Sequence, residues 1–523
     1  MNLTGFTYIK GEGQPFSAVN PATGAELPGG FYPAGQDMVD KALQLAADAF
    51  EKYKNIGKDR KARFLRAIAE EIEALGDQLI ERASAESGLP PARLQGERGR
   101  TTAQLRMFAD LVQEGSWLEA TIDEALPDRQ PLPRTDLRKM LVPLGPVVVF
   151  GASNFPLAFS VAGGDTPSAL AAGCPVVVKA HPAHPGTSAL VGAAILKAAQ
   201  SQQMPDGTFS LLYDTGFKVG EALVMHHLTR AVTFTGSFKG GMALYHLAQQ
   251  RRVPVPVFAE MGSINPVILL PGILESKSGE IAAQYAASIT LGAGQFCTNP
   301  GLMVAIRSAG LDRFETALAK AIENTPPATM LTAGIQQNFD RLSAKILNEA
   351  GVQLLGRSTA KAEGAGSQAC AMVARVDAAQ FLANPVLREE IFGPSSLLIA
   401  ADDRAQLEQV ITVLEGQLTL TIMATENELP DYETLIGRAA DITGRMILNG
   451  VPTGVEVCAA MQHGGPFPAT TDSRFTSVGA SAIRRFARPL SWQNWAPPLL
   501  PDELKPGNPL KIWRMVNQQW TKD

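Results

Sequence analysis

The chain of 523 residues has a formal net charge of −5 at pH 7, and 45% of its residues are hydrophobic. This length allows two or three domains, each with a core of its own, and the charge balance gives no reason to expect nucleic-acid binding. No N-terminal segment resembles a signal peptide, and no apolar run approaches the roughly 20 residues that span a bilayer, so we expect no membrane association.

The first hundred residues predict a mostly helical layer, because their apolar residues recur at helical spacing. The two clearest stretches are Val39, Ala42, Leu43, Ala46, Ala47 and Phe50, and Phe64, Leu65, Ile68 and Ile72. Residues 121–142 are rich in Pro, Asp and Arg, and a turn there would form an arm.

From about Val147 the pattern changes to short apolar strands that alternate with helices. A small-residue helix is expected at Thr166 to Ala172, and a second α/β region runs from Pro266 to about residue 470. Strands that alternate with helices form parallel sheets built from βαβ units, so we predict an α/β fold. The strand candidates are Val147 to Phe150, Val176 to Lys179, Phe209 to Leu212 and Val232 to Thr235.

Four cysteines and six histidines bear on the compartment and on metal binding. The cysteines do not cluster as a disulfide framework or a metal site, and a reducing cytoplasmic compartment suits a free thiol. The histidines are scattered, and His181 and His184 flank prolines instead of sharing a helical face. We therefore expect no metal site.

Asn154 follows the first of the predicted strands, in Gly151-Ala152-Ser153-Asn154-Phe155-Pro156. Its side-chain amide at a strand-to-helix turn is able to donate a hydrogen bond to a developing oxyanion. The alternative is an Asx-turn, in which the side chain bonds only to its own backbone.

Glu260 is a lone acid between two apolar runs, Val253 to Phe258 and Val267 to Leu270. An acid at the edge of a buried strand is costly unless it has a role or a partner. One interpretation is a general base whose pKa is raised by partial burial. The other is a strand-end acid that caps the next helix or pairs with a basic residue.

Cys297 stands among small residues, with Gly294 before it and Gly301 after it. Glycines let the backbone approach a ligand closely, and Gln295 and Thr298 offer hydrogen bonds beside the sulfur. This setting suits a nucleophilic thiolate, which needs access and a polar surround. The alternative is that Cys297 is a small buried hydrophobic residue.

These three segments together resemble the aldehyde dehydrogenase superfamily, and the resemblance extends over nearly the whole chain. Ser153 departs from the pattern, because an aromatic residue usually precedes the asparagine of the oxyanion motif. Six motifs follow in the family's order: Asn20 to Gly24 (N-terminal signature), Ser153 to Leu157 (oxyanion), Phe234 to Ser237 (cofactor turn), Glu260 to Gly262 (general base), Gly294 to Cys297 (nucleophile) and Glu389 to Pro394 (ribose).

The resemblance implies an aldehyde dehydrogenase-like fold with a Rossmann-type cofactor domain, an α/β catalytic domain and a β-arm. The cofactor domain would comprise residues 1–120 and 143–258, and the catalytic domain residues 259–470. Residues 121–142 and 488–501, with a strand near Leu490 to Trp495, would form the arm for oligomerisation. We therefore expect a homodimer or a homotetramer.

The mechanism that the resemblance implies is oxidation of an aldehyde to an acid in two stages. Cys297 attacks the carbonyl, while the Asn154 side chain and the Cys297 backbone N–H hold the oxyanion. Hydride transfer to the nicotinamide leaves a thioester, and Glu260 activates the water that hydrolyses it. The presence of Glu260 separates this chain from the CoA-acylating branch, which generally lacks that acid.

The cofactor turn is expected around Ser237, where Gly236 and Gly241 have the family's spacing. Glycines there allow a pyrophosphate to approach the turn and a helix N-terminus. Lys179 ends a predicted strand, from which a lysine reaches a ribose hydroxyl or a phosphate. A snorkelling surface lysine is the alternative.

The nicotinamide ribose is expected to donate hydrogen bonds to Glu390, with Phe392 packed nearby. Many NAD-preferring relatives carry a glutamate three residues after the strand-end lysine, and Pro182 stands there in this chain. Without that carboxylate a 2′-phosphate meets no like charge, and Lys218 offers a cation nearby. We expect NADP or NAD as cofactor, with NADP favoured.

The segment from His463 to Arg474 departs from the Ser-Gly-x-Gly-Arg pattern of most members. It resembles a subgroup that contains 2,5-dioxovalerate (α-ketoglutaric semialdehyde) dehydrogenases and a bacterial long-chain fatty aldehyde dehydrogenase. The semialdehyde ends in a keto-acid, which needs a cation or several N–H donors at the channel mouth. Phe155 and Arg474 are the candidates for substrate contact, and a surface or interface ion pair is the alternative for Arg474.

We therefore favour α-ketoglutaric semialdehyde as the substrate. Medium-chain or long-chain fatty aldehydes and other semialdehydes are the alternatives within the family. A cofactor-binding protein without activity is a third hypothesis, and an esterase that uses Cys297 is a fourth.

Overall fold

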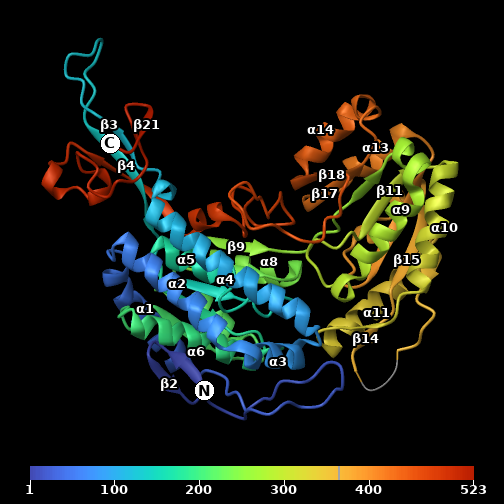
Figure 1. Ribbon diagram of the computed structural model, residues 1–523, viewed down its shortest axis with the longest axis horizontal. Coiled ribbons are helices and arrows are strands. Elements are labelled where there is room, and N and C mark those ends of the chain that lie inside the picture. The colour runs from blue at the N-terminus through green and yellow to red at the C-terminus, as the bar shows by residue number, and fades with distance from the viewer. Residues whose placement is uncertain (363–365) are drawn as a thin grey trace.

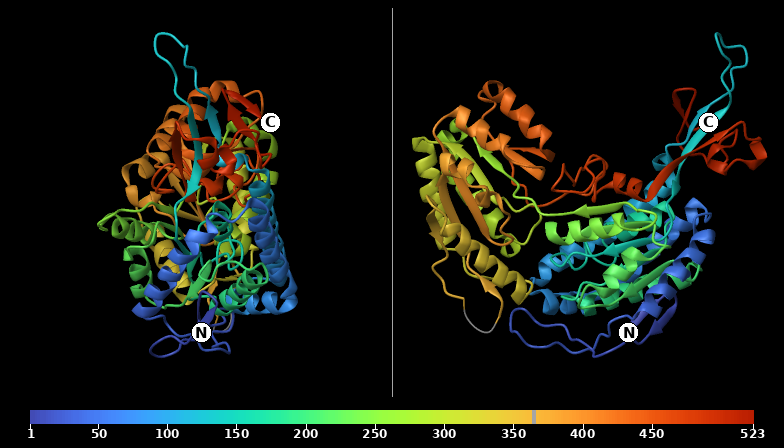
Figure 2. Two further views of the ribbon diagram at one scale, coloured as in Figure 1. Left: turned by 90° about the vertical axis from the view of Figure 1, so that its left-hand side faces the viewer. Right: turned by 180° about the vertical axis from the view of Figure 1, so that it is seen from behind.

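The computed structural model describes residues 1–362 and 366–523, and most of its strands belong to three sheets. Two seven-stranded sheets, each packed with helices, form two bodies, and a five-stranded sheet projects from the first of them (Figure 1). Figure 2 shows the same arrangement from the side and from behind. The predicted α/β fold is confirmed. None of the helices in the described residues combines the length and apolar character needed to span a membrane.

The first sheet contains all four predicted strands. Three of them have the predicted bounds, and the fourth begins one residue earlier, at Ala231. The order is β2 (Thr7–Ile9), β1 (Asn2–Thr4), β7 (Phe209–Leu212), β6 (Val176–Lys179), β5 (Val147–Phe150), β8 (Ala231–Thr235) and β9 (Val257–Glu260). Strands β5 to β9 run parallel, and β1 pairs with β7 in the antiparallel sense.

Both faces of this sheet are covered, which explains why its strands are apolar without alternation. Val147 and Val149 pack into the hydrophobic cluster on one face, and Val148 packs into the cluster on the other. The predicted helical layer is confirmed as α1 (Gln36–Tyr53), α2 (Lys58–Ala74), α3 (Gly76–Ser87) and α4 (Pro91–Glu114). The other helices of this body are α5 (Asp165–Ala172), α6 (Pro185–Ser201), α7 (Lys218–Met225) and α8 (Phe238–Gln249).

The second sheet forms the other body. Its order is β13 (Gln353–Arg357), β15 (Met372–Asp377), β16 (Ser395–Ala401), β11 (Leu302–Ile306), β10 (Val267–Leu269), β17 (Gln417–Met423) and β18 (Thr443–Leu448). A short pair, β12 (Ala328–Thr329) and β14 (Gln368–Ala369), lies apart from it. The helices are α9 (Pro271–Thr290), α10 (Ala309–Glu323), α11 (Ala333–Leu347), α12 (Ala378–Ala383), α13 (Arg404–Thr412) and α14 (Glu433–Asp441).

The projecting sheet is built from the predicted arm and from the C-terminal residues (Figure 1). Its order is β19 (Ala487–Gln493), β4 (Leu137–Pro143), β3 (Thr121–Asp123), β20 (Arg514–Val516) and β21 (Gln519–Thr521). The arm therefore includes two C-terminal strands beyond the predicted segments. The predicted boundary between residues 258 and 259 falls inside β9, which belongs to the first sheet.

The strand order of the first sheet places several predicted site residues at one edge. The chain moves from β5 outward to β7 and then returns to β8 on the other side of β5, so the loops after β5 and β8 diverge. Crevices at such a switch point, outside the carboxyl ends of parallel strands, are where α/β sheets bind ligands. Asn154 follows β5, Gly236 follows β8, and Glu260 ends β9.

Candidate active site

A cavity of about 490 Å³ lies at this edge of the first sheet and reaches the second body. It gathers residues that the sequence places more than two hundred positions apart. The predicted site residues that line it are Asn154, Phe155, Gly236, Ser237, Glu260, Cys297, Glu390 and Phe392.

Cys297 lies on a loop that is held tightly from several sides. Gly294 has a φ of +64°, and a Cβ at that position would lie 2.3 Å from the carbonyl oxygen of Gly393, so only glycine fits there. Asn265 Nδ2 donates to the Cys297 carbonyl at 2.9 Å. The sulfur is therefore presented from a fixed backbone.

The expected hydrogen bonds from Gln295 and Thr298 to the sulfur are not formed. The Gln295 side chain accepts a hydrogen bond from the Leu331 backbone at 3.0 Å and donates to the Gly292 carbonyl. The Thr298 hydroxyl is buried without a hydrogen-bond partner in the described part of the chain. Both side chains are almost fully buried, so they pack under the loop that carries Cys297 instead of contacting the sulfur.

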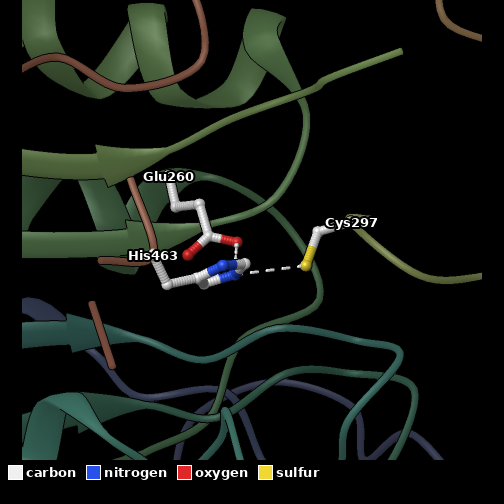
Figure 3. Close-up of side chains that lie close together, drawn as sticks. All are labelled: Glu260, Cys297 and His463. Carbon is white, nitrogen blue, oxygen red and sulfur yellow. Dashed lines mark hydrogen bonds and ion pairs between the residues drawn. The ribbon is translucent and has the colours of Figure 1, made fainter. Parts of the chain in front are cut away.

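The polar neighbour of the sulfur is His463 (Figure 3). Its Nε2 lies 3.4 Å from Cys297 Sγ and 3.1 Å from Glu260 Oε1. Ser477 Oγ donates to the other oxygen of Glu260, Oε2, at 2.5 Å. In this three-residue cluster of Cys297, His463 and Glu260, the histidine and the glutamate are only 1% and 4% exposed, whereas Cys297 is partly exposed and lines the cavity.

The surroundings in this cluster shift the pKa values of Cys297 and Glu260 in opposite directions. Burial raises the pKa of the Cys297 thiol well above its usual value, and the negative charge of Glu260 raises it further. Burial acts to raise the pKa of Glu260 as well, but the charge and hydrogen bond of His463, with hydrogen bonds from Ser477 and Cys297, hold it below its usual value. Glu260 is therefore ionised at neutral pH, beside a thiol that is protonated in the resting state.

His463 is a residue of the site that the sequence reasoning did not single out. The sulfur, nitrogen and oxygen atoms of Cys297, His463 and Glu260 lie within 4.8 Å of one another, an arrangement that is able to hold a metal ion. Residue 463 reaches this place because its segment runs beside β9, where Met261 donates to the Ala469 carbonyl at 2.8 Å. The one signal in the sequence was that the segment from 463 to 474 departs from the family's pattern.

Asn154 also faces the cluster. Its Nδ2 donates to the Gln295 carbonyl at 2.8 Å, which leaves one N–H of the amide for a ligand. This bond spans 141 positions, so the side chain is not used in an Asx-turn. Phe155 packs edge-on against Phe296, and the guanidinium of Arg93 lies over both rings at 4.9 Å.

The cofactor turn has the local structure that a dinucleotide needs. Ser237 begins α8 as its N-cap and accepts a hydrogen bond from the Gly240 backbone at 3.2 Å. A Cβ at Gly241 would lie 2.7 Å from Met261 Cγ, so glycine permits close packing of α8 on β9. Lys179 ends β6 and is half-buried, and burial lowers its pKa. Lys218 is exposed at the first position of α7, and neither lysine lines the cavity.

Glu390 lies at the junction between the two bodies. A Cβ at position 262 would lie 2.2 Å from Glu390 Oε2, so the carboxylate occupies the space that Gly262 leaves. Burial raises the pKa of Glu390 to about 7, and the Ser263 backbone N–H acts in the opposite direction. Phe392, two residues on, lines the same cavity.

Arg474 is not brought to the site, and its prediction as a substrate contact is corrected. Its side chain is 79% exposed, and its Nη2 forms an ion pair with Asp472 at 2.6 Å. The surface ion pair was the alternative for this residue, and it is what the structure contains. Arg474 lines a separate surface hollow with Asp472 and Phe467.

Comparisons with known proteins show the family of the chain. A model of the aldehyde dehydrogenase family matches residues 8–418. "Alpha-ketoglutaric semialdehyde dehydrogenase 2" of Azospirillum brasilense is 51% identical over 514 residues, which cover 98% of each chain. The "Alpha-ketoglutaric semialdehyde dehydrogenase" of Acinetobacter baylyi is 49% identical over 94% of this chain and 93% of that one.

The fold is likewise shared with a solved structure. This is 1-pyrroline-5-carboxylate dehydrogenase from Thermus with bound NAD, at 20% identity and a TM-score of 0.79, over 94% of this chain and 92% of that one. The chain belongs to the aldehyde dehydrogenase family, as an NAD(P)-dependent aldehyde dehydrogenase.

Proposed function

We propose that the protein oxidises α-ketoglutaric semialdehyde to 2-oxoglutarate, with Cys297 as nucleophile and water as the acceptor of the acyl group. The substrate is supported by near-full-length identity to two enzymes named for it. The chemistry is supported by the close approach of Cys297, His463 and Glu260 in one cluster. This cluster is the observation on which the proposal depends most.

The first stage needs a thiolate, and the pKa of Cys297 lies well above neutrality. Glu260 is the nearby base that is ionised, and His463 Nε2 contacts both groups. As the sulfur attacks the aldehyde carbon, the thiol proton therefore passes to the base of the cluster, Glu260, which His463 connects to the sulfur. The free N–H of Asn154 and the Cys297 backbone N–H then hold the oxygen that becomes negative.

The residues of the cavity fit a nicotinamide dinucleotide. Gly236 and Ser237 shape the turn before α8, Gly241 lies in the first turn of that helix, and Glu390 beside Gly262 offers a carboxylate to a ribose. Bound there, the dinucleotide would supply the acceptor for the hydride that leaves the substrate carbon. What remains on Cys297 is a thioester.

Water completes the reaction. Glu260 takes a proton from the water that attacks the thioester, and the Cys297 sulfur leaves. His463 and Ser477 each bond one oxygen of Glu260, which fixes the carboxylate in the plane and position that this step requires. We therefore propose that His463 is a positioning residue for Glu260.

For the cofactor, we propose that NADP is accepted and preferred. Pro182 offers no carboxylate against a 2′-phosphate, and Lys218 supplies a cation at the start of α7. Steady-state kinetics with both cofactors test this, and a strong preference for NAD in kcat/KM would contradict it.

We propose that the five-stranded sheet assembles two or four copies of the chain. It projects from the first body and carries exposed apolar side chains, among them Leu137 and Trp520, which are 38% and 55% exposed. Light scattering after size exclusion would test this, with a monomer as the contrary result. All four cysteines are free, which favours the reducing cytoplasm as the compartment.

The decisive experiment for the substrate compares kcat/KM for α-ketoglutaric semialdehyde, succinic semialdehyde, glutaraldehyde and a long-chain aldehyde. The first should exceed the others. A preference for the long-chain aldehyde would favour the fatty aldehyde alternative. Tight cofactor binding without turnover of any of these aldehydes would favour a cofactor-binding protein without activity. Hydrolysis of an activated ester as the main activity would favour an esterase.

A further inference from the structure

We infer that Arg100 and Arg445 form an anion-binding subsite beside Cys297, which holds the carboxylate of an oxo-acid aldehyde. The subsite deepens the proposed function and rests on it for the identity of the substrate. Arg474, the cation that the sequence suggested for this purpose, lies on the surface, so the substrate's carboxylate needs another partner.

Arg100 lies on α4, and its guanidinium packs over the ring of Phe159, a residue that lines the cavity. Its Nη1 donates to the Val455 carbonyl. Its Nε and Nη2 are buried and have no hydrogen-bond partner in residues 1–362 and 366–523. These two nitrogens form one edge of the guanidinium, the edge that binds a carboxylate through two parallel hydrogen bonds.

Arg100 forms no direct ion pair within the described residues, because none of their carboxylates lies within 4 Å of its guanidinium. The nearest acid along α4 is Glu97, whose charge acts on Arg100 without a hydrogen bond to it. Its Oε1 accepts hydrogen bonds from the backbone of Leu157 and Ala158, and its Oε2 is buried without a partner in the described residues. A partly buried guanidinium with unpaired donors is costly. A ligand carboxylate on the free edge would remove that cost.

Arg445 approaches from the second body, on β18. Its Nη1 and Nη2 donate to the carbonyls of Gly454 and Pro452 at 3.1 and 2.8 Å, and its Nε is buried without a partner in the described residues. Both arginines therefore hold one short loop, residues 452–455. Their guanidiniums converge on it from the two bodies.

Arg100 also lies close to the catalytic cluster. The guanidinium of Arg100 sits over the Phe159 ring at 5.5 Å, and that ring lies 6.3 Å from the ring of His463. The charge of Arg100 also acts on Cys297, where it lowers the thiol pKa against the burial that raises it. The same sulfur is the group that raises the pKa of Arg445 against the effect of burial. The charges of both arginines thus interact with the reacting sulfur.

Carboxylate recognition and simple anchoring of the loop predict different kinetics. Recognition affects only substrates that carry the charge, and it affects mainly KM. Anchoring affects every aldehyde alike, because it does not depend on the charge of the substrate.

The test measures kcat and KM of the full-length enzyme for α-ketoglutaric semialdehyde and for valeraldehyde, which has five carbons and no charge. Arg100→Met should lower kcat/KM for the semialdehyde by about 30-fold or more, through KM, and leave valeraldehyde within about threefold. Arg106→Met is the matched control, since Arg106 is on the same helix and pairs with Glu73 on the surface. Arg445→Met should act in the same direction as Arg100→Met.

Equal losses on both aldehydes, or no loss on either, would overturn the subsite. Inhibition of the unaltered enzyme gives a second measurement that needs no variant: glutarate should compete with the aldehyde, and glutaramide at the same concentration should not. Equal inhibition by the two would also overturn it. If the enzyme prefers succinic semialdehyde, the proposed substrate fails, but Arg100→Met should still weaken that charged substrate selectively.

Discussion

His463 Nε2 lies 3.1 Å from Glu260 Oε1, and both side chains are almost completely buried. The positive potential and the hydrogen bond of this histidine hold the pKa of Glu260 below its usual value, against the effect of burial. Buried alone, the same carboxyl would be protonated at a higher pH. His463 thus keeps a buried base ionised.

His463→Asn should therefore raise the pKa of Glu260. Because Glu260 acts in its ionised form, the acidic limb of the kcat profile should move to higher pH, and kcat at pH 7 should fall about 10-fold or more. The pH profile of kcat measures this. His246→Asn is the control, because His246 is exposed on α8. An unchanged acidic limb would contradict the role of His463.

Glu260→Gln should separate the two stages of the reaction. The thioester should form but hydrolyse slowly, so a burst of reduced cofactor should precede a steady rate that is about 100-fold lower. Stopped-flow absorbance and mass spectrometry of the intact chain measure the burst and the acylated Cys297. Glu280→Gln, at an exposed position on α9, is the control. Unchanged steady turnover would remove Glu260 from the mechanism.

Glu390 should make cofactor binding depend on pH, because burial raises its pKa to about 7. The ionised carboxylate accepts hydrogen bonds more strongly, so the Kd of the cofactor should fall about fivefold between pH 6 and pH 8. Fluorescence titration measures this. In Glu390→Gln the Kd should be higher at pH 8 and nearly independent of pH. The same dependence in both proteins would assign it to another group.

The raised pKa of Glu390 also makes the stability of the folded protein depend on pH, and stability should fall as the pH rises. A carboxyl whose pKa is raised in the folded protein contributes stability below its usual pKa of about 4.3, and that contribution is lost as the pH rises through about 7. The apparent Tm of the protein without cofactor should therefore decline less between pH 5 and pH 8 in Glu390→Gln than in the unaltered chain.

Pro182→Glu should restore a carboxylate where NAD-preferring relatives carry one. A negative charge there repels a 2′-phosphate, so kcat/KM for NADP should fall about tenfold or more, with little change for NAD. Pro182→Gln, of similar size without charge, is the control. If both cofactors lose equally, the residue does not contact the adenosine ribose.

Glu86 should be a strong contributor to stability, because it is fully buried and caps α6. Its two oxygens accept hydrogen bonds at 2.7 Å from the backbone of Gly186 and from both the backbone and the hydroxyl of Thr187. Glu86→Ala leaves these donors and Nη2 of Arg82 without their partner, at a cost of about 3 kcal/mol. The apparent Tm should fall by about 5 °C or more. Glu81→Ala, exposed on the same helix, should change it little.

Local patterns of the sequence predicted much of the fold and half of the site. Val147 to Phe150 and its partner strands were recognisable because a parallel strand buried on both faces reads as a continuous apolar run. Asn154, Gly236 and Glu260 follow or end three such strands, and the carboxyl ends of parallel strands meet at one edge. Their meeting in one cavity therefore follows from the strand pattern and the motif order together.

Other features depended on contacts that no local pattern encodes. His463 reaches Glu260 over 203 positions because its segment pairs with the end of β9, and Arg100 and Arg445 converge because two separate bodies hold one loop between them. Arg474, in contrast, had the right charge in the right segment, but it turns outward to Asp472. The sequence by itself determined which chemical groups are present and which strand ends they follow, since these depend on neighbours along the chain. Only the tertiary structure decided which histidine contacts the sulfur and which arginines hold residues 452–455, because burial and orientation are set by packing between distant segments.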